Sequence, residues 1–184
     1  MDTIAMGLAL GLIVSVPPGP NSILCLNLAA DGIKRAAPLI AGAALTDAVY
    51  SLLAASGVLL SLQAGVGALA YLAPVFLIAT AFLARSTNSL PARAGLAVTV
   101  LNPTTAAIWL GLSATPALRS PSLTELLLRP GLVAVGTAAW FLALATLAAR
   151  VSIRLDASRT ARIQQLLSAL LAAAAGVSLI ALLF

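Results

Sequence analysis

The stretch Val16-Pro17-Pro18-Gly19-Pro20-Asn21 interrupts the first apolar segment of this sequence. Its prolines have no backbone N–H, and Gly19 can adopt conformations that other residues avoid, so helical hydrogen bonding is lost over about one turn. A membrane-spanning helix tolerates such a break only where protein or a water-filled cavity, rather than lipid, receives the freed backbone groups. A simple proline kink would need fewer of these residues. The stretch therefore predicts a broken helix that borders a polar cavity.

A second break, Leu101-Asn102-Pro103-Thr104, follows about half a chain later. Around it, small, polar and aromatic residues recur at three- and four-residue spacing and share one helix face: Thr99, Asn102, Ala106, Trp109 and Ser113. This pattern predicts a second polar wall of the cavity, the alternative being a kinked helix with a satisfied Asn. At the first break we expect Asn21 to cap the resumed helix, whose N–H groups would face an anion such as a carboxylate.

The composition is that of an integral membrane protein. Of 184 residues, 61% are hydrophobic and 8% charged, and the mean hydropathy is +1.10. Five stretches lack Lys and Arg, at 3–30, 36–84, 94–118, 130–149 and 163–184. Each can hold a span of ~20 residues, and the second can hold two, with a hairpin at Gly57 to Gly67. We predict an all-α protein with six transmembrane helices in a single domain, residues 1–184.

The polar segment 86–93 lies near the middle of the chain and divides these spans into two groups of three. Each group begins with a helix that is broken at a Pro/Asn motif. Because three is odd, the second group enters the membrane with opposite polarity. We therefore predict two inverted-topology repeats, residues 1–88 and 91–184, whose broken helices meet near the bilayer midplane. Chance similarity between the halves is the alternative.

The distribution of Lys and Arg predicts the orientation. With the N-terminus outside, the inner loops would hold Lys34, Arg35, Arg85, Arg93, Arg150, Arg154, Arg159 and Arg162, against Arg119 and Arg129 outside. We expect a bacterial-type inner membrane protein with both termini outside and a first segment that is retained rather than cleaved as a signal peptide. Contact with anionic lipid then explains the net charge of +5, and no nucleic-acid partner is expected.

Asp47 is the only acid deep in any predicted span. A charged carboxylate there costs at least ~2.5 kcal/mol. Since no Lys, Arg or His lies within the predicted spans, Asp47 must be protonated, hydrated or bound to a cation for part of its life. It is the candidate proton-coupling residue, and Thr46, Tyr50 and Ser51 extend a polar stripe beside it. The alternative is a protonated Asp that only hydrogen-bonds between helices.

Other residues have less specific signals. Gly7, Gly11, Ser15 and Gly19 make one face of the first helix small, which favours packing inside the bundle over a homodimer interface. Trp140 lies inside the fifth predicted helix, as core or as a substrate contact. Cys25 is the only cysteine and histidine is absent, so we expect no disulfide, no metal site and no cofactor.

The motifs resemble those of the lysine exporter (LysE/RhtB) family of amino-acid exporters. The resemblance rests on Pro18-Gly19-Pro20-Asn21, on Asp47 after a basic turn with Gly32, Lys34 and Arg35, and on Asn102-Pro103, with Trp140 and the chain length in agreement. It implies a six-helix inner-membrane exporter of amino acids or similar small metabolites, driven by the proton or membrane-potential gradient, as an antiporter. Thr104 stands where the family often has Lys, which leaves the cargo open.

From these signals we predict a secondary transporter with alternating access and no catalytic residues. Its predicted substrate site comprises Pro18, Gly19, Pro20, Asn21, Asp47, Tyr50, Asn102, Pro103 and Trp140. The alternatives are a passive channel, a structural membrane subunit or an exporter of hard cations. An intramembrane protease is disfavoured because the predicted spans offer one Asp and no His.

Overall fold

The computed structural model describes residues 3–17, 19–61, 97–115, 118, 122–154 and 166. Its elements are α1 (Thr3–Ser15), α2 (Pro20–Ala30), α3 (Ile33–Ala55), α4 (Val58–Ser61), α7 (Pro103–Ser113) and α8 (Leu123–Arg154), and residues 97–100 are also helical. The described part of the chain contains no strand, which confirms the all-α prediction for that part. The helices predicted within 62–96 and 155–184 lie outside the described residues, apart from the single residue Leu166.

Two described helices are long and apolar enough to cross a membrane, Ile33–Ala55 and Leu123–Val151. The pair α1 and α2 passes the same test as one span, bent by 82° at the break between them. The predicted break in the first helix is therefore confirmed. The described residues show up to three of the six predicted spans.

Glycines define both ends of α3. Gly32 precedes its first turn with φ 131°, and Gly57 follows its last turn with φ 78°, a left-handed conformation that ends many helices. Side chains with a Cβ adopt these angles only with strain. The turn at Gly57 falls on the first residue of the predicted hairpin, and α4 begins at the next residue, but residues 62–67 of that hairpin lie outside the described residues.

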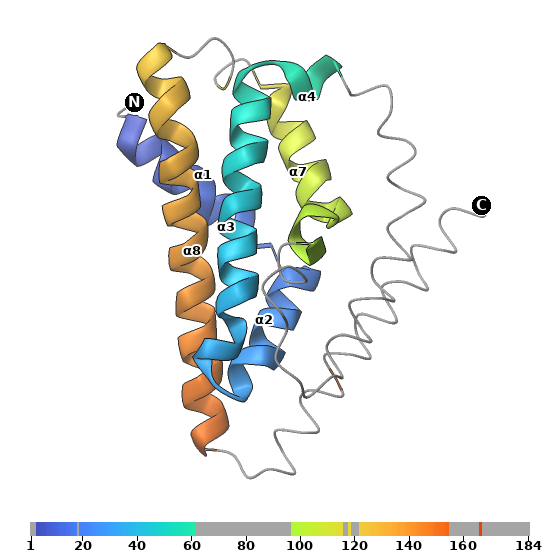
Figure 1. Ribbon diagram of the computed structural model, residues 1–184, viewed down its shortest axis with the longest axis vertical. Helices are drawn as coiled ribbons and strands as arrows, with labels where there is room; N and C mark the ends of the chain where they lie inside the picture. The colour runs from blue at the N-terminus through green and yellow to red at the C-terminus, as the bar shows by residue number, and fades with distance from the viewer. Residues whose placement is uncertain are drawn as a thin grey trace, which may run out of the picture.

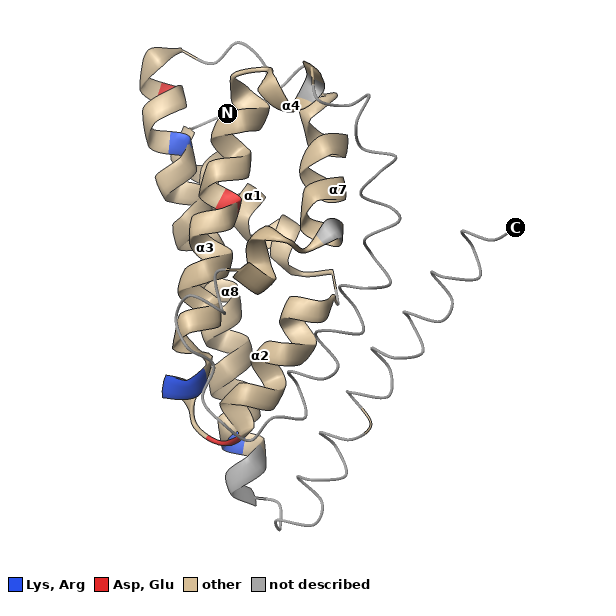
Figure 2. Ribbon diagram, turned by 45° about the vertical axis from the view of Figure 1, so that its right-hand side comes forward, with Lys and Arg blue, Asp and Glu red and all other residues tan. Residues whose placement is uncertain are grey.

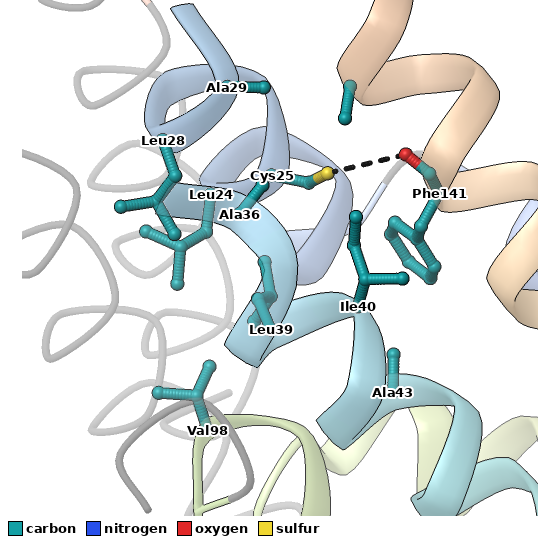
Figure 3. Packing of buried hydrophobic residues seen from close by; sticks show 11 residues of the cluster. Leu24, Cys25, Leu28, Ala29, Ala36, Leu39, Ile40, Ala43, Val98 and Phe141 are labelled. Atoms are coloured by element: carbon teal, nitrogen blue, oxygen red, sulfur yellow. Dashed lines mark hydrogen bonds between the residues drawn. The ribbon is translucent and has the colours of Figure 1, made fainter. Parts of the chain in front are cut away.

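Helix α8 lies against α1, α2 and α3, as Figure 1 shows. One apolar cluster joins α2, α3 and α8 through Leu24, Leu39, Phe141 and their neighbours (Figure 3). Within it the Cys25 thiol lies 3.7 Å from the carbonyl oxygen of Phe141, so the lone cysteine is a small core residue. This cluster holds α2, the helix that follows the break, against the two long helices α3 and α8.

The small face of α1 packs against α8 of the same chain. A Cβ at Gly7 would lie 2.6 Å from the Leu132 Cβ. A Cβ at Gly11 would lie 2.8 Å from the backbone nitrogen of Thr137 and 3.0 Å from the Gly136 Cα. The two backbones touch where these glycines cross, which confirms intramolecular packing of this face.

Charged residues lie toward the ends of the helices, and the ribbon between them is largely uncharged (Figure 2). Lys34 and Arg35 begin α3 and Arg150 lies in the last turns of α8, at the same end of the molecule (Figure 1). The prediction that Arg129 lies in an outer loop is wrong. The residue lies inside α8, with 3% of its side chain exposed, and not in a loop, because Glu125 and the Leu118 carbonyl oxygen bind its guanidinium.

Candidate functional site

A polar cavity lies where the break between α1 and α2 meets α3 and the start of α7. Its empty volume is about 410 Å³, counting the space at its open mouth. It is lined by residues on both sides of both breaks and on the middle of α3: Val14, Ser15, Pro17, Gly19, Asn21, Ser22, Ala43, Thr46, Asp47, Thr99, Asn102, Thr104, Thr105, Ile108 and Phe141. The two sequence motifs, which are far apart in the chain, therefore border one cavity.

Helix α2 begins at Pro20, two residues earlier than predicted from the sequence. Gly19 is the N-cap and Pro20 occupies the first turn, where a missing N–H costs nothing. The prediction that Asn21 caps this helix is wrong, because proline already starts the helix before it. Asn21 is instead buried at 7% exposure, and its Oδ1 has no hydrogen-bond partner among the described residues. This buried acceptor borders the cavity.

On the α7 side Asn102 is the N-cap, and its Oδ1 accepts a hydrogen bond of 3.0 Å from the Thr104 N–H. Pro103 follows as the first helical residue. The carbonyl of Thr99, which a proline at 103 leaves without its helical donor, accepts from the Asn102 N–H at 3.3 Å. The second break is thus a turn with internal hydrogen bonds, and the predicted face of Thr99, Asn102, Ala106, Trp109 and Ser113 is buried throughout.

The two helices that restart after the breaks run in opposite directions. Figure 1 shows α2 descending and α7 ascending from the middle of the molecule. Their first turns, with Asn21 and Ser22 on one side and Thr104 and Thr105 on the other, line the same cavity. Each helix N-terminus carries roughly half a positive charge on N–H groups without intrahelical partners. In α2 the N-cap residue is Gly19, which has no side chain to cap those groups, so they can bind an anionic ligand.

Asp47 is the only ionisable residue among the described residues that line the cavity. It is 5% exposed and lies on α3. Its Oδ1 accepts a 2.8 Å hydrogen bond from the Trp109 indole on α7, and its Oδ2 accepts one of 2.8 Å from the Thr137 hydroxyl on α8. One carboxyl group therefore joins three helices at the wall of the cavity. Each carboxyl oxygen has a second lone pair beyond the one used in these bonds, and Asp47 is among the residues that line the cavity.

The other predicted residues are placed less centrally. Tyr50 donates a 3.3 Å hydrogen bond to the Val100 carbonyl oxygen and does not line the cavity, and Pro20 and Pro103 act through the backbone as helix starters. Trp140 packs against the apolar cluster of α2, α3 and α8, away from the cavity lining. Pro18 lies outside the described residues. The predicted polar stripe is partly engaged, since the hydroxyls of Thr46 and Thr99 lie 3.1 Å apart.

Sequence reasoning missed Thr137, and it placed Trp109 on the polar face without assigning it to the site. Thr137 is completely buried and contacts Asp47 from a helix that reads as continuous hydrophobic sequence. The available signal was weak, a lone hydroxyl next to Gly136 at a point where a close helix crossing brings α1 and α8 together. Among the described residues no group of three or more His, Cys, Asp and Glu could hold a metal ion.

The two tryptophans offer a matched test of the Asp47 bridge, the pair of hydrogen bonds by which Trp109 and Thr137 hold the Asp47 carboxyl group. Trp109→Phe removes the donor to Asp47 Oδ1 and leaves a buried carboxyl oxygen without its partner, which costs about 1–3 kcal/mol. Trp140→Phe removes an indole N–H that is buried and has no hydrogen-bond partner among the described residues, so its cost is expected to be below about 1 kcal/mol. Thermal unfolding of the purified protein in detergent measures both. Equal destabilisation by the two variants would contradict the bridge.

Broken apolar helices that border a polar cavity, with Asp47 in its wall, are features of membrane transport proteins. Residues 12–182 match the family model of the LysE type translocators, so the chain belongs to this family. It is a membrane translocator, and this family consists of transporters rather than enzymes. Searches of curated proteins and of solved structures found no match to the chain.

Proposed function

We propose that this chain is a secondary transporter that exports amino acids or similar small metabolites and is coupled to the proton or membrane-potential gradient. The observation that carries the proposal is the shared cavity, in which two opposed helix N-termini, a buried amide and one carboxyl group surround the same space. Membership of the LysE translocator family supports transport as the activity.

The cavity has the chemistry to bind a zwitterion. The uncapped first turn of α2 offers N–H groups and a positive helix end to a carboxylate. Acceptors for an ammonium group are the Oδ1 of Asn21, which is buried and has no partner within the described parts of the chain, and the carboxyl of Asp47. Both charged ends of an amino acid would then find compensation, although the described lining residues include no Lys or Arg.

Alternating access would arise by rocking of one three-helix half against the other. The opposite directions of α2 and α7 support an inverted-repeat arrangement with residues 1–88 and 91–184 as its halves. The orientation that places Lys34, Arg35 and Arg150 inside puts both termini outside the bacterial-type inner membrane. If the protein forms a homodimer, it would do so through another surface, because α8 already covers the small face of α1.

The test is export from proteoliposomes loaded with radiolabelled basic, neutral and hydroxylated amino acids, with and without a proton gradient. Saturable, gradient-dependent export of one class is expected, because a carrier binds its cargo at a finite number of sites. Asn21→Ala should raise the half-saturating concentration at least about tenfold, since a lost hydrogen bond to a charged group costs about 1.5–3 kcal/mol. Flux that does not saturate would favour a channel, and absence of flux for every amino acid would contradict the proposed cargo.

A further inference from the structure

The hydroxyl of Thr137 has two acceptors but one hydrogen. Its Oγ1 lies 2.8 Å from Oδ2 of Asp47 and 3.3 Å from the carbonyl oxygen of Gly11, and the side chain is fully buried. A hydroxyl donates one hydrogen bond and can accept others. The two distances therefore describe alternatives for the same hydrogen, and the protonation state of Asp47 decides between them.

Trp109 determines which oxygen of Asp47 can carry a proton. The indole N–H is a donor only, and it lies 2.8 Å from Oδ1, so Oδ1 stays an acceptor in both protonation states. The proton then belongs on Oδ2, the oxygen that faces Thr137. When Oδ2 is ionised, it takes the Thr137 hydrogen. When Oδ2 is protonated, it donates to Thr137, whose own hydrogen turns to the Gly11 carbonyl.

We propose that Thr137 is a positioning residue that transmits the protonation of Asp47 to helix α1, by moving its hydroxyl hydrogen from the carboxylate to the Gly11 carbonyl. The proposal rests on the proposed function, in which Asp47 exchanges protons with the cavity that it lines. The proton enters and leaves at Oδ2, and no other bond is made or broken. Protonation thus adds a hydrogen bond from α8 to α1, and deprotonation removes it.

The position of Gly11 makes this bond relevant to the cavity. Gly11 lies one turn before the end of α1 at Ser15, and its carbonyl already accepts a 2.8 Å hydrogen bond from the Ser15 hydroxyl. Ser15 itself lines the cavity. The close crossing of α1 and α8, which only glycine allows at this position, holds the Gly11 carbonyl within reach of Thr137. A change at Asp47 therefore reaches the last turn before the break.

Few other groups compete with this effect. On α3, Tyr50 is the titratable side chain that interacts electrostatically with Asp47. On the described parts of α1, α2, α7 and α8 that border the cavity, the lining side chains carry no charge. Cys25 of α2 is directed at the Phe141 carbonyl instead. A pH effect centred on this cavity can therefore be assigned to Asp47 by comparing Asp47→Asn.

The first readout is the fluorescence of Trp109, which becomes the only tryptophan in a Trp140→Phe background. We expect a pH-dependent change that Asp47→Asn abolishes, because the indole lies 2.8 Å from the titrating group. Thr137→Val, which keeps the shape but has no hydroxyl, should move the midpoint upward by about one pH unit, since it removes a donor to the ionised carboxylate. Thr137→Ser should restore the original midpoint, and Thr137→Ala serves as a second hydroxyl-free variant.

The second readout is a spin label at Val16→Cys, an exposed position in the break, in a Cys25→Ala background. Its mobility should depend on pH in the parent and in Thr137→Ser, and should lose this dependence in Thr137→Val and in Asp47→Asn. If Thr137→Val changes neither the fluorescence midpoint nor the response of the spin label, the proposed role of Thr137 as a relay from Asp47 to α1 is wrong, while the proposed function still stands. Fluorescence that titrates equally in Asp47→Asn would instead overturn the proton site of the proposed function, and the relay with it.

Discussion

Gly136→Ala is expected to destabilise the protein by about 3 kcal/mol or more, because the added methyl group has no space. Its Cβ would meet the Leu8 carbonyl oxygen closer than real Cβ atoms approach, and would lie 3.1 Å from both the Gly11 Cα and the Leu12 nitrogen. These atoms are backbone, so relief requires that α1 and α8 separate. Thermal unfolding in detergent and the yield of folded protein measure the effect.

Gly131→Ala is the matched control on the same helix. A Cβ at Gly131 meets no heavy atom of the described residues within 4 Å, and the residue is exposed. Alanine favours the helix over glycine by about 1 kcal/mol, so this variant should unfold at the same temperature as the parent or higher. Equal stability of Gly136→Ala and the parent would show that the close crossing of α1 and α8 is absent in the membrane protein.

The crossing also shows what the sequence could predict of the fold. The four-residue spacing of Gly7, Gly11 and Ser15 predicted that a backbone would approach α1, because small residues allow this wherever they repeat along one face. The partner could not be named, since many apolar segments have a small residue somewhere. Gly136 became its counterpart only when the fold placed α8 across α1.

The candidate site was predicted unevenly for a similar reason. Gly19, Asn21, Asp47 and Asn102 were identified because a broken helix or an acid in an apolar segment violates a local rule, and all four line the cavity. Thr137 breaks no local rule, because a hydroxyl in an apolar helix is common and can bond its own backbone. Its importance depends on a tertiary contact with Asp47, which lies 90 residues away in the sequence. Helical periodicity relates only residues a few positions apart, so it cannot predict this contact.

The cap at Asn21 failed for a different physical reason. Asn is a favoured N-cap, but the proline before it already has the backbone angle of a first helical residue, so the helix starts there. At the second break Asn precedes the proline, and the same rule makes Asn102 the cap. The order of Asn and Pro decides which Asn side chain caps its own helix, and it leaves the Asn21 Oδ1 without a hydrogen-bond partner among the residues that the structure describes.

Asp47→Asn is expected to reduce gradient-driven export to the level of protein-free liposomes. The amide cannot exchange a proton, but its oxygen can still accept from Trp109 and its NH₂ can donate to Thr137. The variant should therefore fold and resemble the protonated carboxyl group, with the Thr137 hydrogen held toward Gly11. Because the structure would be preserved in one protonation state, exchange of labelled for unlabelled amino acid without a gradient should persist, which separates coupling from binding.

Asp31→Asn is the control for loss of a carboxylate as such. Asp31 lies at the turn between α2 and α3, where it pairs with Arg35 at 2.9 Å with both side chains substantially exposed. Such surface pairs contribute about 1 kcal/mol or less, so export should remain gradient-driven. If Asp47→Asn and Asp31→Asn export with the same dependence on the gradient, Asp47 is not the coupling site. The hydrogen bonds from Trp109 and Thr137 to Asp47 would then have only a structural role, because interhelical hydrogen bonds of this kind also stabilise membrane proteins that transport nothing.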